Sequence, residues 1–340
     1  MALTSQQICA AARNRAKAPG YTAQSGQYLN SLLQEIAQTY DFAVNKRAFN
    51  FQLTTATAPI GNLQVNLASG PFTLPPDYLR AKRGDIVYYP TSNWPSRLIP
   101  IDLEEFDVQV QQAGFQNFPT LWATDVTIRK DVVSTTGNTT LGNGALSSID
   151  NLNGIAVGMG VWGDAIKPGT VTLVSAIDSG AGTVTIAPAS NVNATYAAPA
   201  VSMLNFAVCP IAYVWPAASG AYPAFVRYYA LPSDIATPES SSQIPWFPNT
   251  NILIDGVAGA LMKDTGDDRW IQFLGEDQPD SVPTRMRKIL QLKDDASNRS
   301  QRVHLDRRRF GQSWGSLPSS KVLGYIWLLC AILPVIKAVC

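Results

Sequence analysis

The chain has 340 residues, enough for two domains with a substantial core, but only 15% of them are charged. Its formal net charge of +1 argues against a general polyanion-binding protein. The four cysteines lack C-x-x-C spacing and His304 is the only histidine, so the sequence offers neither a zinc site nor an evident disulfide framework.

Two helices are predicted at the N-terminus. Thr4 and Gln7 form a capping-box signature, which predicts a helix through residues 8–12. After an interruption at 20–21, Ser25 is expected to cap a second helix with a continuous apolar stripe. The stripe consists of Leu29, Leu32, Leu33, Ile36 and Tyr40. The first residues lack a contiguous apolar core with a cleavage site, so no signal peptide is expected.

Short β segments dominate the next region. The run 49–55 is predicted to be a strand, followed by a pair of short β segments, 71–80 and 84–90, around Pro75, Pro76 and Gly84. A short helix is expected at 103–112 and a strand at 119–125.

The region 126–205 has a different composition. Between Val132 and Phe206 the charged residues are Asp150, Asp164, Lys167 and Asp178, and short β-branched runs alternate with Gly turns. This pattern predicts an all-β domain, either an Ig-like sandwich or a small barrel, inserted into a loop of the main domain. The three aspartates are interpreted as turn residues, because the other ligands of a calcium site are missing.

Strands and helices alternate again after residue 206. Strands are predicted at 207–215 and from 222 to Pro232. Asn249 or Thr250 is expected to cap a helix with an apolar stripe of Ile254, Val257, Ala258 and Leu261. Gly256 and Gly259 within that helix predict close approach of another element.

Two further helices are expected downstream. Asp267 or Asp268 is predicted to cap a short helix that carries Trp270, Phe273 and Leu274. An amphipathic helix is predicted at 285–292.

Charge is divided unevenly along this part of the chain. Residues 233–280 contain nine acidic and two basic residues, a net charge of −7. Residues 281–321 contain ten basic and three acidic residues, a net charge of +7. The two blocks can neutralise each other within one chain, or they can pair between neighbouring subunits of a head-to-tail ring.

The C-terminal region is predicted to be an extended arm with an apolar end. Apolar periodicity fails over 297–321, where Gly, Ser and Pro recur. Residues 322–336 are uncharged, but fifteen residues are fewer than the roughly 20 that span a bilayer. Burial against a partner or a neighbouring subunit is the favoured interpretation, with membrane contact as the alternative.

Together these patterns predict an α+β fold with a discontinuous organisation. A helical bundle packed with a small β-sheet or sandwich is expected to form a helix-rich core from 1–125 and 206–296. The inserted β domain would occupy 126–205, and the arm 297–340.

Motifs of catalysis are absent from the sequence. It has no phosphate loop, no dinucleotide-binding glycine pattern, no nucleophile elbow and no H-E-x-x-H. A Ser–His–Asp triad would require His304, which lies in the predicted arm. Adjacent Asp267 and Asp268 are better explained as helix-start charges than as a glycosidase pair. We therefore expect no enzyme activity, no cofactor and no metal; a carbohydrate-active enzyme built on the β insert is the rival hypothesis.

The order of several segments resembles one known family, the head-to-tail adaptor (connector) proteins of short-tailed, podovirus-type bacteriophages. The segments are LNSLLQEIAQTYDF, FTLPPDYLRAKRGDIVYY, PIDLEEFDVQ, VRYYALPSDI, PWFPNTNILIDGVAGALMKDTGDDRWIQFLGE and SQRVHLDRRRFGQSW. The resemblance covers most of 1–125 and 206–321. The insert, with GMGVWGDAIKPGTVTLVSAID, is similar to β modules that decorate phage structural proteins. The apolar end after Lys321 departs from the pattern.

The resemblance implies a virion protein that forms a ring, expected to be dodecameric, between the portal protein and the tail nozzle protein. The ring would be made in the bacterial host cytoplasm and located at the head–tail junction. Double-stranded DNA would pass through its channel during packaging and ejection without sequence readout.

The resemblance also implies that the arm binds the portal. Arg307, Arg308 and Arg309 would form bidentate salt bridges, and Phe310 and Trp314 would be apolar anchors. Leu317, Tyr325 and Trp327 complete the predicted portal-binding set. Three adjacent arginines are also what a solvated basic patch contains, and that interpretation stays open. The alternative function is a tail-associated protein that attaches to the host surface or membrane.

Overall fold

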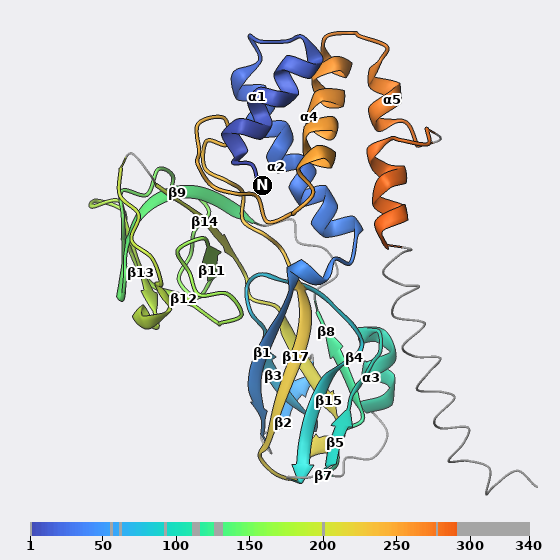
Figure 1. Ribbon diagram of the computed structural model, residues 1–340. Coiled ribbons are helices and arrows are strands. Elements are labelled where there is room, and N and C mark those ends of the chain that lie inside the picture. Colours follow the sequence, from blue (N-terminus) through green and yellow to red (C-terminus); the bar gives the residue numbers. More distant parts are fainter. Residues whose placement is uncertain are drawn as a thin grey trace, which may run out of the picture. The chain divides into compact units, whose positions relative to one another are not determined.

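The computed structural model describes residues 2–54, 57–60, 63–91, 94–110, 116–125, 132–198, 201–276 and 278–290. It is a mixed helix-and-sheet structure that contains a small closed barrel, as Figure 1 shows, which confirms the expected mixture of α and β structure. The chain divides into two compact units, 1–283 and 284–340, and the elements described below lie in the first unless stated otherwise.

Four helices pack together although they come from both ends of the first unit. They are α1 (Ser5–Ala16), α2 (Thr22–Thr39), α4 (Thr250–Asp264) and α5 (Trp270–Leu274), and α4 contacts the other three. The predicted capping box is confirmed, since Thr4 accepts from the Gln7 N–H and Gln7 accepts from the Thr4 N–H. Asn249 caps α4, and its predicted apolar stripe is buried.

Two predicted caps are wrong. Tyr21, and not Ser25, is the N-cap of α2; the helix begins earlier, and the Ser25 hydroxyl donates to the Thr22 carbonyl inside the first turn. The N-cap of α5 is Arg269, because the Asp267 carboxylate accepts from the Arg269 N–H and guanidinium and not from the helix. This pairing lowers the pKa of Asp267 to about 2.

The two glycines of α4 lie where other helices approach, as predicted. A Cβ on Gly256 would be 2.5 Å from Leu32 Cδ2, and a Cβ on Gly259 would be 2.8 Å from Leu274 Cγ and 2.9 Å from Phe273 Cβ. The first neighbour is the end of a flexible side chain. The second pair lies close to the backbone of α5, so it has less freedom to move.

We therefore expect Gly259→Ala to lower the free energy of unfolding by about 1–3 kcal/mol through overpacking, although alanine favours helix by about 1 kcal/mol. Gly256→Ala should be close to neutral, because Leu32 can turn away. Urea denaturation would measure both, with Gly20→Ala as the control, since a Cβ there meets nothing within 4 Å. A Gly259→Ala protein more stable than the parent would contradict the close packing of α4 on α5.

Two larger sheets share one hydrophobic core. The four-stranded sheet has the order β1 (Lys46–Leu53), β17 (Tyr222–Ala230), β4 (Tyr78–Thr91), β5 (Trp94–Arg97). The five-stranded sheet has the order β2 (Thr57–Ile60), β3 (Leu63–Thr73), β15 (Ile211–Trp215), β8 (Leu121–Thr124), β6 (Ile99–Pro100). Ile86, Tyr88, Val226 and Tyr228 from the first meet Trp122 and Val214 from the second in that core.

Shorter elements complete this region. They are η1 (Ala43–Asn45), α3 (Leu103–Val110) and the two-stranded sheet of β7 (Gln116–Asn117) and β16 (Ala217–Ala218). The predicted helix at 103–112 and strand at 119–125 are confirmed by α3 and β8. The strand predicted at 49–55 corresponds to β1.

Two strand predictions are wrong in their extent. β4 runs without interruption from Tyr78 to Thr91, where two short segments were predicted, because a register shift against β17 absorbs the irregularity around Gly84. The strand predicted at 207–215 is divided at 208–210. Pro210 has no N–H to donate, and the two parts pair in different sheets.

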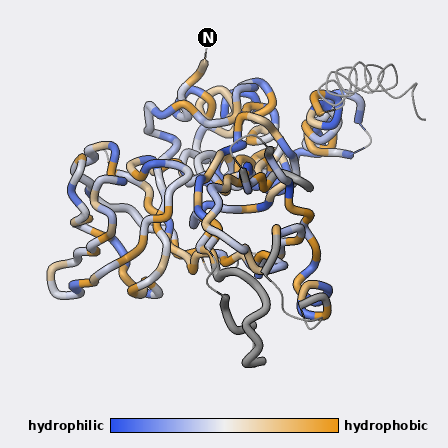
Figure 2. Tube along the Cα trace, turned by 90° about the horizontal axis from the view of Figure 1, so that it is seen from below, coloured by the Kyte–Doolittle hydropathy of each residue, from blue (hydrophilic) through white to orange (hydrophobic). Residues whose placement is uncertain are grey.

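Residues 133–207 contain a closed barrel with the strand order β10 (Asn143–Ser147), β13 (Thr183–Ala187), β12 (Leu173–Asp178), β11 (Gly160–Gly163), β14 (Ser202–Ala207), β9 (Val133–Thr140). A short helix, η2 (Ala189–Asn191), follows β13. β10 alternates exposed and buried residues. Figure 2 shows hydrophilic and hydrophobic residues mixed along the Cα trace. Of the two predicted architectures, the structure has the barrel.

The two ends of the barrel region meet. Val133 at the start of β9 pairs with Phe206 near the end of β14. In the five-stranded sheet, the Asp125 N–H donates to the Ile211 carbonyl over 3.3 Å. The barrel thus leaves and rejoins the sheet between the neighbouring strands β8 and β15.

The last described helix spans 282–290, most of it in the second unit, and begins three residues before the predicted start. Met286 within it is buried. The rest of the predicted helix, the arm and the apolar end lie outside the described residues.

Candidate functional site

The predicted portal-binding residues all lie outside the described ranges, so their role stays a prediction. These are Arg307, Arg308, Arg309, Phe310, Trp314, Leu317, Tyr325 and Trp327. His304 and the basic residues around it lie outside as well. Within the described residues, the most heavily buried charged group is elsewhere, at Asp77.

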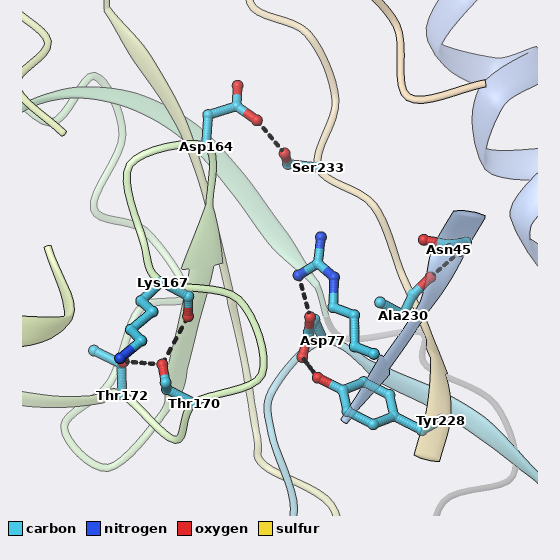
Figure 3. Close-up of polar contacts among 10 residues, drawn as sticks. Asn45, Asp77, Asp164, Lys167, Thr170, Thr172, Tyr228, Ala230 and Ser233 are labelled. Atoms are coloured by element: carbon cyan, nitrogen blue, oxygen red, sulfur yellow. Dashed lines mark hydrogen bonds and ion pairs between the residues drawn. The ribbon is translucent and has the colours of Figure 1, made fainter. Parts of the chain in front are cut away.

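Asp77 accepts two side-chain hydrogen bonds although it is only 2% exposed. The Tyr228 hydroxyl donates to Oδ1 over 2.7 Å, and Arg47 Nη1 donates to Oδ2 over 2.6 Å. Arg47 on β1 and Tyr228 on β17 are direct partners in the antiparallel register, so both side chains emerge on the inner face of the sheet beside Asp77. Figure 3 shows Asp77 and Tyr228 pointing toward each other.

Burial dominates the electrostatics of this group. It raises the pKa of Asp77 above its ordinary value, while Arg47 and the Tyr228 hydroxyl favour the charged form and oppose the shift. The pKa of Tyr228 is raised as well, by burial and then by the Asp77 charge. The tyrosine is therefore a fixed hydrogen-bond donor.

A second carboxylate, half-buried, lies on the barrel side. Asp164, just after β11, accepts from Ser233 Oγ and from Gln243 Nε2, both over 3.0 Å. Burial raises the pKa of Asp164. Asp164 lies in a turn, as predicted, but its carboxylate accepts from residues far away in the sequence. The Asp178 carboxylate instead accepts from the nearby N–H groups of Gly180 and Ala181.

The partners of Asp164 belong to an irregular segment, 231–249, that we call the strap. It follows β17 and precedes α4. The Gln243 carbonyl accepts from the Ser5 N–H over 2.8 Å, and the Ile235 N–H donates to Asn30 Oδ1 over 3.0 Å, which ties the strap to α1 and α2. The strap thus bonds to the barrel and to two helices.

A cavity of about 180 Å³ lies between these groups. Asp77, Asp164, Arg47, Lys167 and Ser233 are among its lining residues, so two acidic and two basic side chains face one space. Figure 3 shows Lys167 and Thr170 of the barrel on one side and Asp77 on the other. We call Arg47, Asp77, Tyr228, Asp164 and Ser233 the polar joint.

The polar joint is built for structure more than for reaction. A buried carboxylate with a raised pKa beside a tyrosine can mark an acid–base site. Here, however, both Asp77 oxygens are already occupied by protein donors. The cavity is also smaller than the roughly 300 Å³ at which ligand pockets begin. The arrangement fixes the barrel, the sheet and the strap to one another.

The sequence analysis missed Asp77. The available signal was a single acidic residue in the otherwise apolar and aromatic run before Arg80, directly after two prolines. That signal gives no partner, because Tyr228 is 151 positions away.

Other candidate chemistry is limited in the described ranges. They contain no group of three or more His, Cys, Asp and Glu side chains that could hold a metal ion. None of the helices described is long and apolar enough to cross a membrane. No protein-family model matches the chain, and no curated protein matches it.

Proposed function

We propose that this protein is a structural subunit of a short-tailed bacteriophage virion, a head-to-tail adaptor that forms a ring between the portal and the tail nozzle. The order of its segments, which resembles that family, carries the proposal. Double-stranded DNA passes through the channel of the ring during packaging and ejection, and scattered phosphate contacts suffice for a wall along which DNA slides.

The packing of distant segments supports this organisation. α1 and α2 pack on α4, so the two halves of the proposed discontinuous core, 1–125 and 206–296, meet in one helical group. The barrel lies between them in sequence, and its ends meet at Asp125 and Ile211. We propose that 126–205 is the inserted domain and that 297–340 is the arm that reaches the portal.

Changing Arg307, Arg308 and Arg309 together to alanine is expected to weaken binding to the portal protein at least about tenfold, since each lost charged hydrogen bond is worth about 1.5–3 kcal/mol. The fold of the subunit should be unchanged. Native mass spectrometry of the protein, alone and mixed with its candidate portal protein, would measure assembly. Lys321→Ala is the matched control, because it removes one charge from the same segment.

Unchanged portal binding by the triple variant would reject the arm assignment. The apolar run 322–336 favours a second function, attachment of a tail protein to the host surface or membrane. Flotation with liposomes that is lost on deletion after Lys321, together with indifference to the portal, would favour that function over the adaptor.

A further inference from the structure

The outer face of the four-stranded sheet is basic and aromatic. Side chains alternate along β17, so that Phe225 and Arg227 point away from the core that holds Val226 and Tyr228. Register places Val87 of β4 opposite Phe225, and Arg97 of β5 opposite Val87, which puts Arg97 on this face. We call Lys46, Tyr89, Arg97, Phe225 and Arg227 the basic face.

The basic face is exposed at Tyr89, Arg97 and Arg227 and half-buried at Lys46, and two of its three cations lie near aromatic rings. Arg97 and Arg227 are exposed, and Tyr89 is 37% exposed. The Arg227 guanidinium lies 5.8 Å from the Phe225 ring centroid, and Lys46 Nζ lies 5.6 Å from that of Tyr229. Neither β1 nor β17 contains an acidic residue. The surface therefore suits an acidic partner that also offers apolar side chains.

A surface of the opposite kind surrounds α3. Residues 98–125 contain five acidic residues and no basic residue. Asp102, Glu104 and Glu105 are exposed, and beside them Val108 is 60% and Ile99 is 44% exposed. We call these five residues the acidic face.

The two faces lie on opposite sides of the same pair of sheets. Phe106 anchors α3 on Ala123, Tyr213 and Trp215 of the five-stranded sheet. Those residues alternate with Trp122 and Val214, which point into the core shared with the four-stranded sheet. The α3 side therefore faces away from that core in one direction, and the basic face in the other. Asp102, Glu104 and Glu105 also line a cavity with Arg80 of β4, whereas no residue of the basic face lines that cavity.

We propose that the acidic face of one copy docks on the basic face of the next copy. A contact between two different surfaces is heterologous, so every copy keeps one face of each kind for a further neighbour, and the series closes into a ring or continues as a filament. This contact would be the subunit interface of the proposed adaptor, and the inference that it closes a ring rests on that proposed function. It assigns the subunit interface to the β-rich region, apart from the −7 and +7 blocks.

Charge reversal in two separate variants tests the contact. Arg97→Glu/Arg227→Glu reverses the basic face, and Glu104→Arg/Glu105→Arg reverses the acidic face. Each variant alone should need at least about tenfold more protein to assemble, because like charges then meet. An equimolar mixture should assemble again with alternating composition, since each reversed face meets the other variant's reversed face. Native mass spectrometry, with one variant ¹⁵N-labelled, would measure this.

A cross-link provides a second measurement on the unchanged protein. Carbodiimide treatment of mixed ¹⁴N and ¹⁵N copies should join Lys46 of one copy to Glu104 or Glu105 of another through an amide. Lys263→Glu reverses a charge on α4 and is the control, for which normal assembly is expected.

Normal assembly of either reversed variant alone, or the absence of that cross-link at high protein concentration, would overturn the inference. The inference would also be overturned if Arg97→Glu/Arg227→Glu assembled normally but its assemblies no longer bound double-stranded DNA. That result would favour a surface that faces DNA. Assembly through the two faces in a protein that ignores the portal would support the contact and reject the adaptor function. Rings that form on the portal protein equally well with either charge-reversed variant would support the adaptor function and reject the contact.

Discussion

Replacing Arg47 with methionine is expected to lower the free energy of unfolding by about 3–5 kcal/mol at pH 7.5, the range found when one partner of a buried ion pair is removed. Asp77 would keep the Tyr228 hydroxyl but lose its cation, and at 2% exposure it has little access to water. The Arg47 side chain is itself 35% exposed, so the loss falls mainly on the carboxylate. Urea denaturation would measure the change.

The loss should become smaller in acid. Burial raises the folded-state pKa of Asp77, so the folded protein binds this proton more tightly than the unfolded chain does. Protonation of Asp77 therefore adds to the free energy of unfolding as the pH falls through the raised pKa of the folded state. The gain reaches its full size below the pKa of the unfolded chain, about 3.9. Without Arg47 that folded pKa rises further, so the recovery should begin at a higher pH than in the parent.

Arg227→Met is the matched control, because Arg227 is exposed on the other face of the same sheet. It should change the stability of the isolated subunit by less than about 0.5 kcal/mol. If the Arg47→Met and Arg227→Met proteins had equal free energies of unfolding, the Arg47–Asp77 pair would not stabilise the fold.

Truncation of Phe106 to alanine is the second large effect, with an expected loss of about 3–5 kcal/mol. Phe106 is fully buried, and its ring centroid lies 6.3 Å from that of Tyr213. It is the fully buried side chain with which α3 packs on Ala123, Tyr213 and Trp215 of the five-stranded sheet, beside the partly buried Leu103. Hydrogen exchange should therefore show α3 losing protection first, while the barrel keeps its own.

Phe118→Ala is the control for the same chemical change. Phe118 is 50% exposed, and its ring centroid lies 6.0 Å from that of Tyr222. We expect a cost of about 1 kcal/mol or less from that contact. Equal losses in the two variants, or unchanged exchange in α3, would show that Phe106 does not hold the helix on the sheet.

Features determined within a few residues were predictable from the sequence. The capping box at Thr4, the Asn249 cap and the buried stripe of α4 depend on neighbours within one or two helical turns. Gly256 and Gly259 correctly indicated close packing, although the sequence did not identify Leu32 and α5 as the neighbours.

Features determined by distant partners were not predictable. Asp77 and Asp164 find their hydroxyl partners 151 and 69 positions away, so no local pattern distinguishes them from ordinary turn residues. The break between β14 and β15 also depends on distant partners, because the two parts of one apolar run pair with strands of two different sheets. Ser25 failed as a cap because a favourable residue type does not fix where a helix begins.

The meeting of Asp125 with Ile211 has a consequence for how such a chain can change over generations. These two residues, which flank the barrel in the sequence, are joined by a hydrogen bond, and the entropic cost of closing a loop grows only slowly with its length. Recombination at this point could therefore exchange one domain for another while β8 and β15 keep their register. A replacement domain would have to provide a hydrogen-bond acceptor for Ser233 and Gln243 in place of Asp164, or these two side chains would hydrogen-bond to water.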